Sequence, residues 1–298
     1  LPYLSTAFVW DQWRHLHVDH CEVMADRLGR ELYERISHEG LPVWTGAERS
    51  EGVSIHLCGP CPHREGGLTL VLKLDGVAIY RLAFSLIKLE RIEAEPELKA
   101  HGVGIYVGQV QGYPGYFEQI KDATGRCRDI APPDLLVAAL VGLAGPLGIQ
   151  VIKAVSFEYC PSYQKMSTLA SCFNYEQFWV GRWGATFDGR HYHLGLPISE
   201  KPISEIKANH RGRTLAKRRF KHEVADTVAS NMWMTLPRSE ALGPLVSPYA
   251  QPDDASGQAQ GVPVSAPASA GKVSGQVALK ACASGRQIGS PSLQTMAP

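Results

Sequence analysis

The sequence predicts a mixed α/β fold in which a largely antiparallel sheet is flanked by helices. One observation is a β-hairpin pattern at residues 68–87, and another is a strand at 104–111 that leads through helical sequence to a second strand at 151–156. The third is helical periodicity near the start of the chain. With 298 residues, 44% of them apolar, the chain can bury a sizeable core.

The first element is helical. From Trp10 to Ile36 apolar and aromatic residues recur at helical spacing with charges between them, which predicts one or two amphipathic helices ending near Gly40. We therefore expect residues 1–45 to form an N-terminal helical segment.

The sheet follows. Residues 53–57 are strand-like, and the runs at 68–74 and 77–87 flank Asp75-Gly76. This dipeptide suits a type I′ turn, in which both central residues have positive φ. The strand at 104–111 is expected to pair with the second arm of the hairpin.

A crossover then makes the sheet mixed. A helix starting near Pro133 is apolar nearly all round, so it should pack between layers before the strand at 151–156. A helix at 174–183, a turn at 188–189 and a strand from His191 follow. These elements define an expected core domain at residues 46–236.

Two further segments differ in composition. A basic helix is expected near 205–226, whereas residues 237–298 are rich in Ala, Ser, Gly, Pro and Gln. The latter have too few large apolar groups to offset the entropy lost on ordering, which predicts a disordered tail.

Charge and cysteine content exclude some classes. A net charge of +1 provides no global field for nucleic acid or a membrane surface, and no apolar run is long enough for a transmembrane segment. Seven cysteines, an odd number, argue against a disulfide framework and favour a reducing compartment. Motifs of hydrolases, zincins, NTPases and Rossmann enzymes do not occur.

Two clusters contain metal-type side chains. His56, Cys58, Cys61 and His63 could form a zinc site or a dithiol centre, but four ligands so close would strain one loop, and a plain surface loop is the commoner outcome. In the second cluster, His15, His17, Asp19 and His20 divide between helix faces, which favours one packed and two solvated histidines. We expect no metal, and the sequence leaves the zinc alternative open.

The strongest local charge feature is the basic run at 207–221, which contains Arg211 and Arg218. Such a run contacts phosphates in some proteins and is a solvated, paired face in more of them.

Several phrases together resemble the VirK/YbjX family of bacterial proteins over residues 1–226. They are Leu1-Pro-Tyr-Leu, His20, Phe84-Ser85, Gly108-Gln-Val-Gln-Gly112, Ala154-Val-Ser156, Tyr175-Glu-Gln-Phe-Trp179 with Gly184, and Arg211 to Phe220. The resemblance implies a cytoplasmic Gram-negative protein linked to virulence and to envelope or peptide stress, without an established activity.

The order of elements is also similar to GNAT-type acyltransferases. In these enzymes a glycine turn after the central strand binds acyl-CoA pyrophosphate through backbone N–H groups, and the resemblance places that turn at Gly108, Gln109, Gln111, Gly112 and Gly115. Pro114 departs from the pattern because it lacks an N–H, and Trp179 stands near the usual general-acid Tyr.

The sequence thus leaves enzyme activity open. The leading hypothesis is binding of acyl-CoA or another acyl thioester at this turn, with Arg211 and Arg218 contacting phosphates and Tyr175 or Glu158 moving protons as an amine attacks. In the alternative, a non-catalytic virulence or envelope-stress factor binds a protein through the basic helix at 207–221. Nucleic acid is the less favoured partner of that helix because no DNA-reading motif accompanies it.

Overall fold

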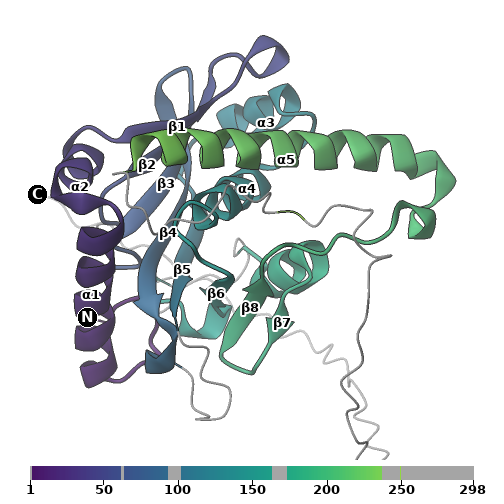
Figure 1. Ribbon diagram of the computed structural model, residues 1–298. Coiled ribbons are helices and arrows are strands. Elements are labelled where there is room, and N and C mark those ends of the chain that lie inside the picture. The colour runs from purple at the N-terminus through teal and green to yellow at the C-terminus, as the bar shows by residue number, and fades with distance from the viewer. Residues whose placement is uncertain (1, 62–63, 93–101, 163–172, 237–248, 250–298) are drawn as a thin grey trace, which may run out of the picture. The chain divides into compact units, whose positions relative to one another are not determined.

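The computed structural model describes residues 2–61, 64–92, 102–162, 173–236 and 249. Within these ranges, eight strands form one sheet in the order β1-β2-β3-β4-β5-β6-β8-β7 (Figure 1). The strands are β1 (Leu41–Thr45), β2 (Val53–Cys58), β3 (Leu68–Leu74), β4 (Val77–Lys88), β5 (Val103–Gly112), β6 (Val151–Val155), β7 (Thr186–Phe187) and β8 (His191–Gly195).

The helices flank this sheet, which confirms the predicted mixed α/β class. They are α1 (Trp10–Arg27), α2 (Gly29–His38), α3 (Phe117–Arg126), α4 (Pro132–Ala144), a π-helical turn η7 (Gln177–Arg182) and α5 (Ala208–Thr235). Short 3₁₀ turns lie at Glu48–Ser50, Leu89–Arg91, Phe157–Tyr159 and Ile203–Glu205.

All neighbouring strands are antiparallel except β5 and β6. These two pair in parallel because α3 and α4 lie between them in the chain and carry it back across the sheet. The parallel pairing covers only Ile105–Val107 of β5. Beyond Val107, β5 continues on β4 alone, so the sheet opens on the β6 side.

Helix α4 forms the middle layer of the core, as its uniformly apolar sequence predicted. It contacts β3, β4 and β5 on one side and α5 on the other, so it lies between the sheet and α5 (Figure 1). The closest approach is at Gly142, where an added Cβ would lie 2.3 Å from the carbonyl oxygen of Ala225. Only glycine permits α5 to pack this closely on α4.

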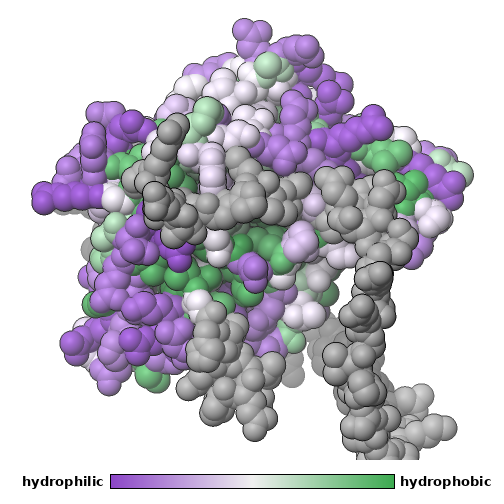
Figure 2. All heavy atoms as spheres, viewed as in Figure 1, coloured by the Kyte–Doolittle hydropathy of each residue, from purple (hydrophilic) through white to green (hydrophobic). Residues whose placement is uncertain are grey.

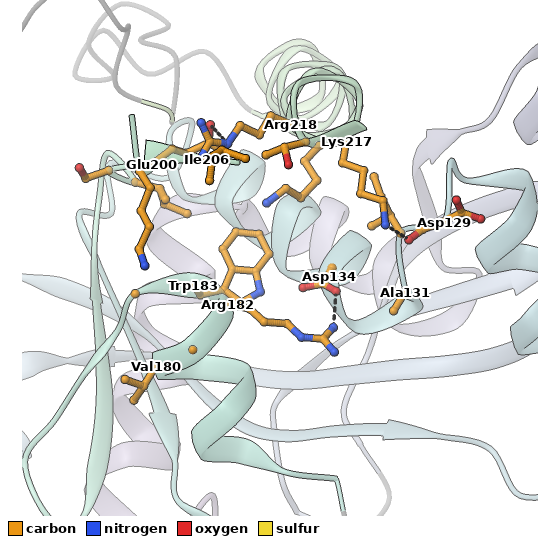
Figure 3. Close-up of a pocket in the computed structure, with 18 residues that line it drawn as sticks. Asp129, Ala131, Asp134, Val180, Arg182, Trp183, Glu200, Ile206, Lys217 and Arg218 are labelled. Atoms are coloured by element: carbon orange, nitrogen blue, oxygen red, sulfur yellow. Dashed lines mark hydrogen bonds and ion pairs between the residues drawn. The ribbon is translucent and has the colours of Figure 1, made fainter. Parts of the chain in front are cut away.

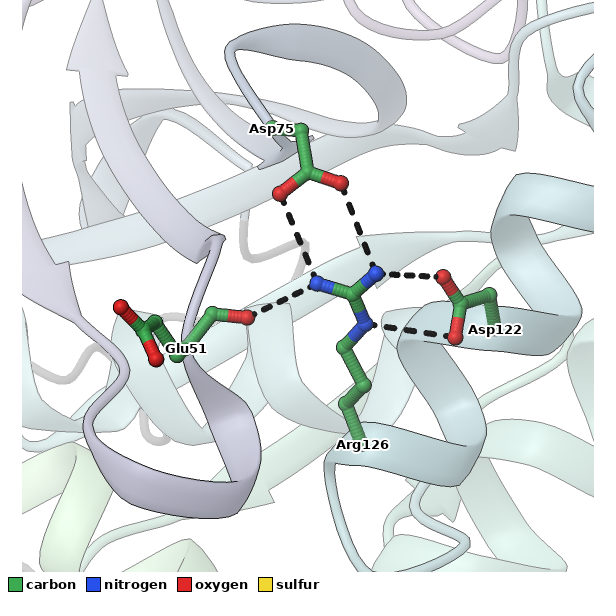
Figure 4. A network of polar contacts seen from close by, with 4 residues as sticks. All are labelled: Glu51, Asp75, Asp122 and Arg126. Atoms are coloured by element: carbon green, nitrogen blue, oxygen red, sulfur yellow. Dashed lines mark hydrogen bonds and ion pairs between the residues drawn. The ribbon is translucent and has the colours of Figure 1, made fainter.

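The turn between β3 and β4 has the predicted type I′ backbone. Asp75 and Gly76 have φ values of 49° and 82°. The Asp75 carboxylate accepts hydrogen bonds from Arg126, which also binds Asp122 on α3 and the carbonyl oxygen of Glu51 (Figure 4). One guanidinium group therefore connects three segments that are distant in the sequence.

Helix α1 contacts β4. The pairing of β4 with β3 stops at Phe84, so the following residues of β4 have no partner on β3. The Nδ1 atom of buried His20 accepts the N–H of Leu86 at 3.1 Å and so replaces a strand partner. His15 and His17 are exposed, which confirms the prediction of one packed and two solvated histidines. Figure 2 shows that hydrophilic side chains cover most of the outer surface of α1, at the left of the view.

Two boundaries differ from the sequence prediction. Residues 41–45, which we expected to belong to the N-terminal helical segment, form the edge strand β1, and Pro42 lies at a bulge of this strand. The basic helix begins at Ala208 and continues to Thr235, because buried apolar residues from Val224 to Met232 extend its packing on α4. The predicted tail lies outside the described residues except for Tyr249, which stacks on His222. The domain boundaries at 45 and 236 stay predictions.

Candidate functional site

A cavity of about 730 Å³ lies between α5 and the segment that follows η7 (Figure 3). We call it the basic cavity. It is lined by Asp129, Ile130, Ala131, Asp134, Val180, Gly181, Arg182, Trp183, Gly184, Ile198, Ser199, Glu200, Lys201, Ile206, Thr214, Lys217, Arg218 and Lys221.

One face of α5 provides the cationic wall. Thr214, Lys217 and Lys221 follow one another at helical spacing, so they lie on the same side of the helix. The ammonium of Lys221 lies 4.5 Å from the centroid of the Trp183 ring, a cation–π contact. Burial lowers the pKa of both lysines, because a charged amine loses hydration inside the cavity.

The acidic residues of the cavity are paired. Arg182 binds Asp134 at 2.9 Å, and Figure 3 shows this pair on the side of the cavity opposite α5. Arg218 binds Glu200 at 3.1 Å. Five basic and three acidic side chains line the cavity, which leaves an excess of two positive charges.

The opposite wall depends on η7. A π-helical turn adds one residue per turn, and here it buries Phe178 and Trp179 while Arg182 remains exposed. Trp183 follows at once and is buried, and its Nε1 atom has no hydrogen-bond partner among the described residues. This buried indole N–H is therefore an unsatisfied donor at the wall of the cavity.

The residues of the predicted glycine turn lie elsewhere: Gly108 to Gly112 belong to β5 where it leaves β6, and only Gly115 follows the strand. Gly108 faces the backbone of the loop between β2 and β3, since an added Cβ would lie 2.1 Å from the carbonyl oxygen of Glu65. Gly112 packs beside Tyr80 and Ile120, and Gly115 has a positive φ of 86°. These glycines do not line the basic cavity.

The glutamines of the same turn belong to a polar network. The amide of buried Gln109 donates to the Gln111 oxygen at 2.9 Å and to the Ser162 hydroxyl at 3.3 Å. Arg81 donates to the same Gln111 oxygen, and the thiol of Cys61 contacts the Gln109 oxygen at 3.9 Å. Both side chains are therefore held by other protein groups in this structure.

Tyr175 fills the opening between β5 and β6. Its hydroxyl accepts the N–H of Val110 at 3.2 Å, and burial raises its pKa well above the usual value. Glu158 is exposed at the end of β6. Both residues line one cavity of about 470 Å³, so the structure brings together the two predicted proton-transfer residues.

The two predicted phosphate-binding arginines have different surroundings. Arg218 lines the basic cavity. Arg211 is exposed and donates to the carbonyl oxygens of Ile206 and Ser204. Neither arginine lines a cavity with the glycine turn, and the roles proposed for Gly108, Gln109, Gln111, Gly112, Gly115, Tyr175 and Glu158 stay predictions.

The predicted cluster of His56, Cys58, Cys61 and His63 begins in the last residues of β2. Cys58 is half-buried, and burial raises the pKa of its thiol. The Nε2 atom of His56 lies 3.2 Å from the Ser54 hydroxyl, and His63 lies outside the described residues. Among the residues that the structure describes, no three His, Cys, Asp or Glu side chains are arranged to hold a metal ion.

Sequence reasoning missed most of the basic cavity. Lys217 and Lys221 belong to the basic run, but Trp183, Asp134 and Glu200 come from three other segments. The available signal was the helical spacing of Thr214, Lys217 and Lys221, which places a hydroxyl and two amines on one face.

Comparison with known proteins gives one family and no individual relative. No helix in the described ranges is both long and apolar enough to cross a bilayer. No curated protein and no solved structure matches the chain. The family described as "Protein of unknown function (DUF535)" matches residues 1–232. The chain therefore belongs to the DUF535 family, which is the VirK/YbjX family that its motifs resemble.

Proposed function

We propose that this protein binds an anionic, phosphate-bearing small molecule in the basic cavity. The observation that carries the proposal is the position of Lys221, whose ammonium lies over the Trp183 ring at the wall of a cavity with excess positive charge. A partly desolvated amine gains most from an anion, because nearby charges interact strongly where water is excluded.

The size and the donors of the cavity support a ligand rather than a lone ion. A volume of about 730 Å³ is in the range of cofactor sites. Lys217 and Lys221 supply ammonium donors, and Thr214 supplies a hydroxyl. Phosphate oxygens accept hydrogen bonds from all of these groups.

The ligand class that we favour within this proposal is an acyl thioester such as acyl-CoA. Its pyrophosphate would neutralise the excess charge, and its adenine or pantetheine part would use the remaining volume. The support for this choice is the order of elements in the sequence, which is similar to that of GNAT-type acyltransferases.

Acyl transfer to an amine is a second candidate function. It is favoured by one observation: Tyr175 and Glu158 line the same cavity beside that opening. Glu158 would accept the proton of the attacking amine, and the Tyr175 hydroxyl would donate toward the leaving sulfur after giving up its contact with Val110. From the family resemblance we also propose a cytoplasmic protein with a role in virulence or envelope stress.

Calorimetry with coenzyme A, acetyl-CoA and inorganic phosphate tests the ligand proposal. We expect coenzyme A and acetyl-CoA to bind, with affinity falling as salt increases, and Lys217→Gln and Lys221→Gln each to weaken binding about tenfold. Lys121→Gln on α3 is a matched control that should leave binding unchanged. Failure of coenzyme A and phosphate to bind the purified protein contradicts the proposal.

Substitutions of two other arginines test the alternative, in which the basic helix is a contact surface for a macromolecule. Binding of a protein partner should depend on exposed Arg211 and Arg219, which do not line the cavity. Binding of nucleic acid should fall steeply with salt and should depend on the same two arginines. Loss of either interaction in Arg211→Gln, with no affinity for coenzyme A, favours that reading.

A further inference from the structure

The cavity that contains Tyr175 and Glu158 has a composition opposite to that of the basic cavity. Five of its lining residues are aromatic and two are acidic, and no Lys or Arg is among the described residues that line it. We call it the aromatic cavity. It is lined by Ser156, Phe157, Glu158, Phe173, Asn174, Tyr175, Glu176, Phe187, Gly189 and Tyr192.

The aromatic rings belong to three segments that meet at the ends of β6 and β8. Phe187 and Tyr192 stack with ring centroids 4.8 Å apart and planes 30° apart. Phe173 meets Tyr175 edge to face at 5.3 Å, and Phe157 lies 6.4 Å from the same ring. Rings from both groups line one volume of about 470 Å³, so a guest inside it contacts several π-systems at once.

The two carboxylates give this volume a negative potential. Glu158 and Glu176 are exposed at its rim. Burial raises the pKa of the Tyr192 hydroxyl, and the negative charges of Glu176 and Glu158 raise it further. Both carboxylates therefore act on the interior of the cavity and not only on the solvent outside.

These features together select one ligand chemistry. An anion would be repelled by the two carboxylates and by the negative faces of the rings. A neutral apolar guest would gain from the rings but nothing from the charges. A cation gains from both, and aromatic cages with nearby carboxylates are a general means of binding ammonium groups.

We propose that the aromatic cavity binds a small organic ammonium ion, held by the faces of Phe187, Tyr192 and Tyr175 and by the charges of Glu158 and Glu176. A primary amine could also donate hydrogen bonds to the carboxylates, whereas a quaternary ammonium group would rely on the rings and on charge alone. This inference does not depend on a ligand in the basic cavity. It does not depend on acyl transfer either, because a quaternary ammonium ion has no nucleophilic nitrogen that could be acylated.

Ligand-observed NMR and calorimetry on the full chain test it with three probes. Choline and ethanolamine represent the quaternary and the primary ammonium, and 3,3-dimethylbutan-1-ol has the shape of choline without its charge. We expect at least one of the two cations to bind, and the neutral probe to bind about fivefold more weakly than the better-binding cation, or not at all. No binding of either cation at millimolar concentration, or binding of the neutral probe as tight as that of the better-binding cation, overturns the inference.

Variants at the rim locate the binding without disturbing the core. Glu158→Gln and Glu176→Gln remove one charge each, and Phe187→Leu removes a half-exposed ring while keeping an apolar side chain. Each should weaken binding of the better cation about threefold to tenfold. Glu31→Gln, at an exposed position of α2, controls for net charge and should change nothing. Unchanged affinity in all three rim variants would assign the bound cation to another place and refute the proposed site.

Discussion

The ammonium of Lys221 lies 4.5 Å from the centroid of the Trp183 ring, in a cavity where the neighbouring carboxylates of Asp134 and Glu200 already bind arginines. The carboxylates thus neutralise Arg182 and Arg218, and the two lysines of α5 account for much of the remaining positive charge. This arrangement distinguishes the basic cavity from an ordinary solvated face of paired charges, which the basic run alone would have suggested.

Packing between α4 and α5 gives the first prediction. Gly142→Ala places a methyl group against the backbone at Ala225, so we expect the free energy of unfolding to fall by about 1–3 kcal/mol despite the better helix propensity of alanine. Urea denaturation measures this change. Gly212→Ala, in an open part of α5, should instead stabilise the protein by up to about 1 kcal/mol. Equal effects at the two sites would contradict the close contact.

The hydrogen bond between Tyr175 and Val110 gives the second prediction. Tyr175→Phe removes the acceptor of a buried N–H, which should cost about 1–3 kcal/mol of stability. Chemical denaturation followed by circular dichroism measures the loss. If Tyr175 also acts in acyl transfer, the folded variant should lose acetylation of the amine substrate while it keeps affinity for coenzyme A. A variant as stable as the parent chain would show that this bond contributes nothing.

Buried histidine makes stability depend on pH. Burial lowers the pKa of His20 to about 4 from 6.5, so between these values the unfolded chain binds a proton that the folded chain does not. The stabilisation is present above pH 6.5 and is lost as the pH falls toward 4. Around pH 5.5 we expect a slope of about 1 kcal/mol per pH unit from this residue.

The variant His20→Phe tests that assignment, because it removes the titrating group from a buried position. Its unfolding free energy should depend less on pH between 4.5 and 6.5, although His191, whose pKa burial also lowers to about 4, adds a slope of the same sign. His15→Gln on the exposed side of α1 should leave the slope as it is. A slope unaltered in His20→Phe would disprove the role of His20.

The Arg126 network gives a prediction that depends on salt. Arg126→Met removes contacts to Asp75, Asp122 and the Glu51 carbonyl, so the urea midpoint should fall. Because these are exposed charges, the difference should shrink at high ionic strength. Arg30→Met breaks a single pair with Glu34 on α2 and should have a smaller effect. The prediction fails if the two variants behave alike at low salt.

Local chemistry made much of the fold predictable. The Asp75-Gly76 turn requires positive φ at both residues. The helix after Pro133 is apolar on all sides, so it can be fully buried only between two layers. Strand β1 escaped prediction because Pro42 lies at a bulge that only its pairing with β2 reveals. The helix expected at 174–183 is present, but its π-helical geometry over Gln177–Arg182 was not predicted, because a π-helix has no characteristic spacing in a sequence of six residues.

The candidate sites were harder to predict because they are assembled from distant segments. The sequence predicted that Gly108 binds a ligand, whereas in the structure this glycine permits a close approach of the loop at Glu65. Both explanations require glycine, so sequence alone could not separate them. The contact of Lys221 with Trp183 joins residues 38 positions apart, and no local sequence pattern predicts it.

Hydrogen–deuterium exchange in the presence and absence of coenzyme A tests the central claim most directly, because it reports where the ligand lies. We predict protection of the peptides that cover residues 180–184, 198–201 and 214–221, which surround the basic cavity. Protection confined to residues 108–115, or protection nowhere although calorimetry detects binding, would contradict the assignment of the phosphate-bearing ligand to this cavity.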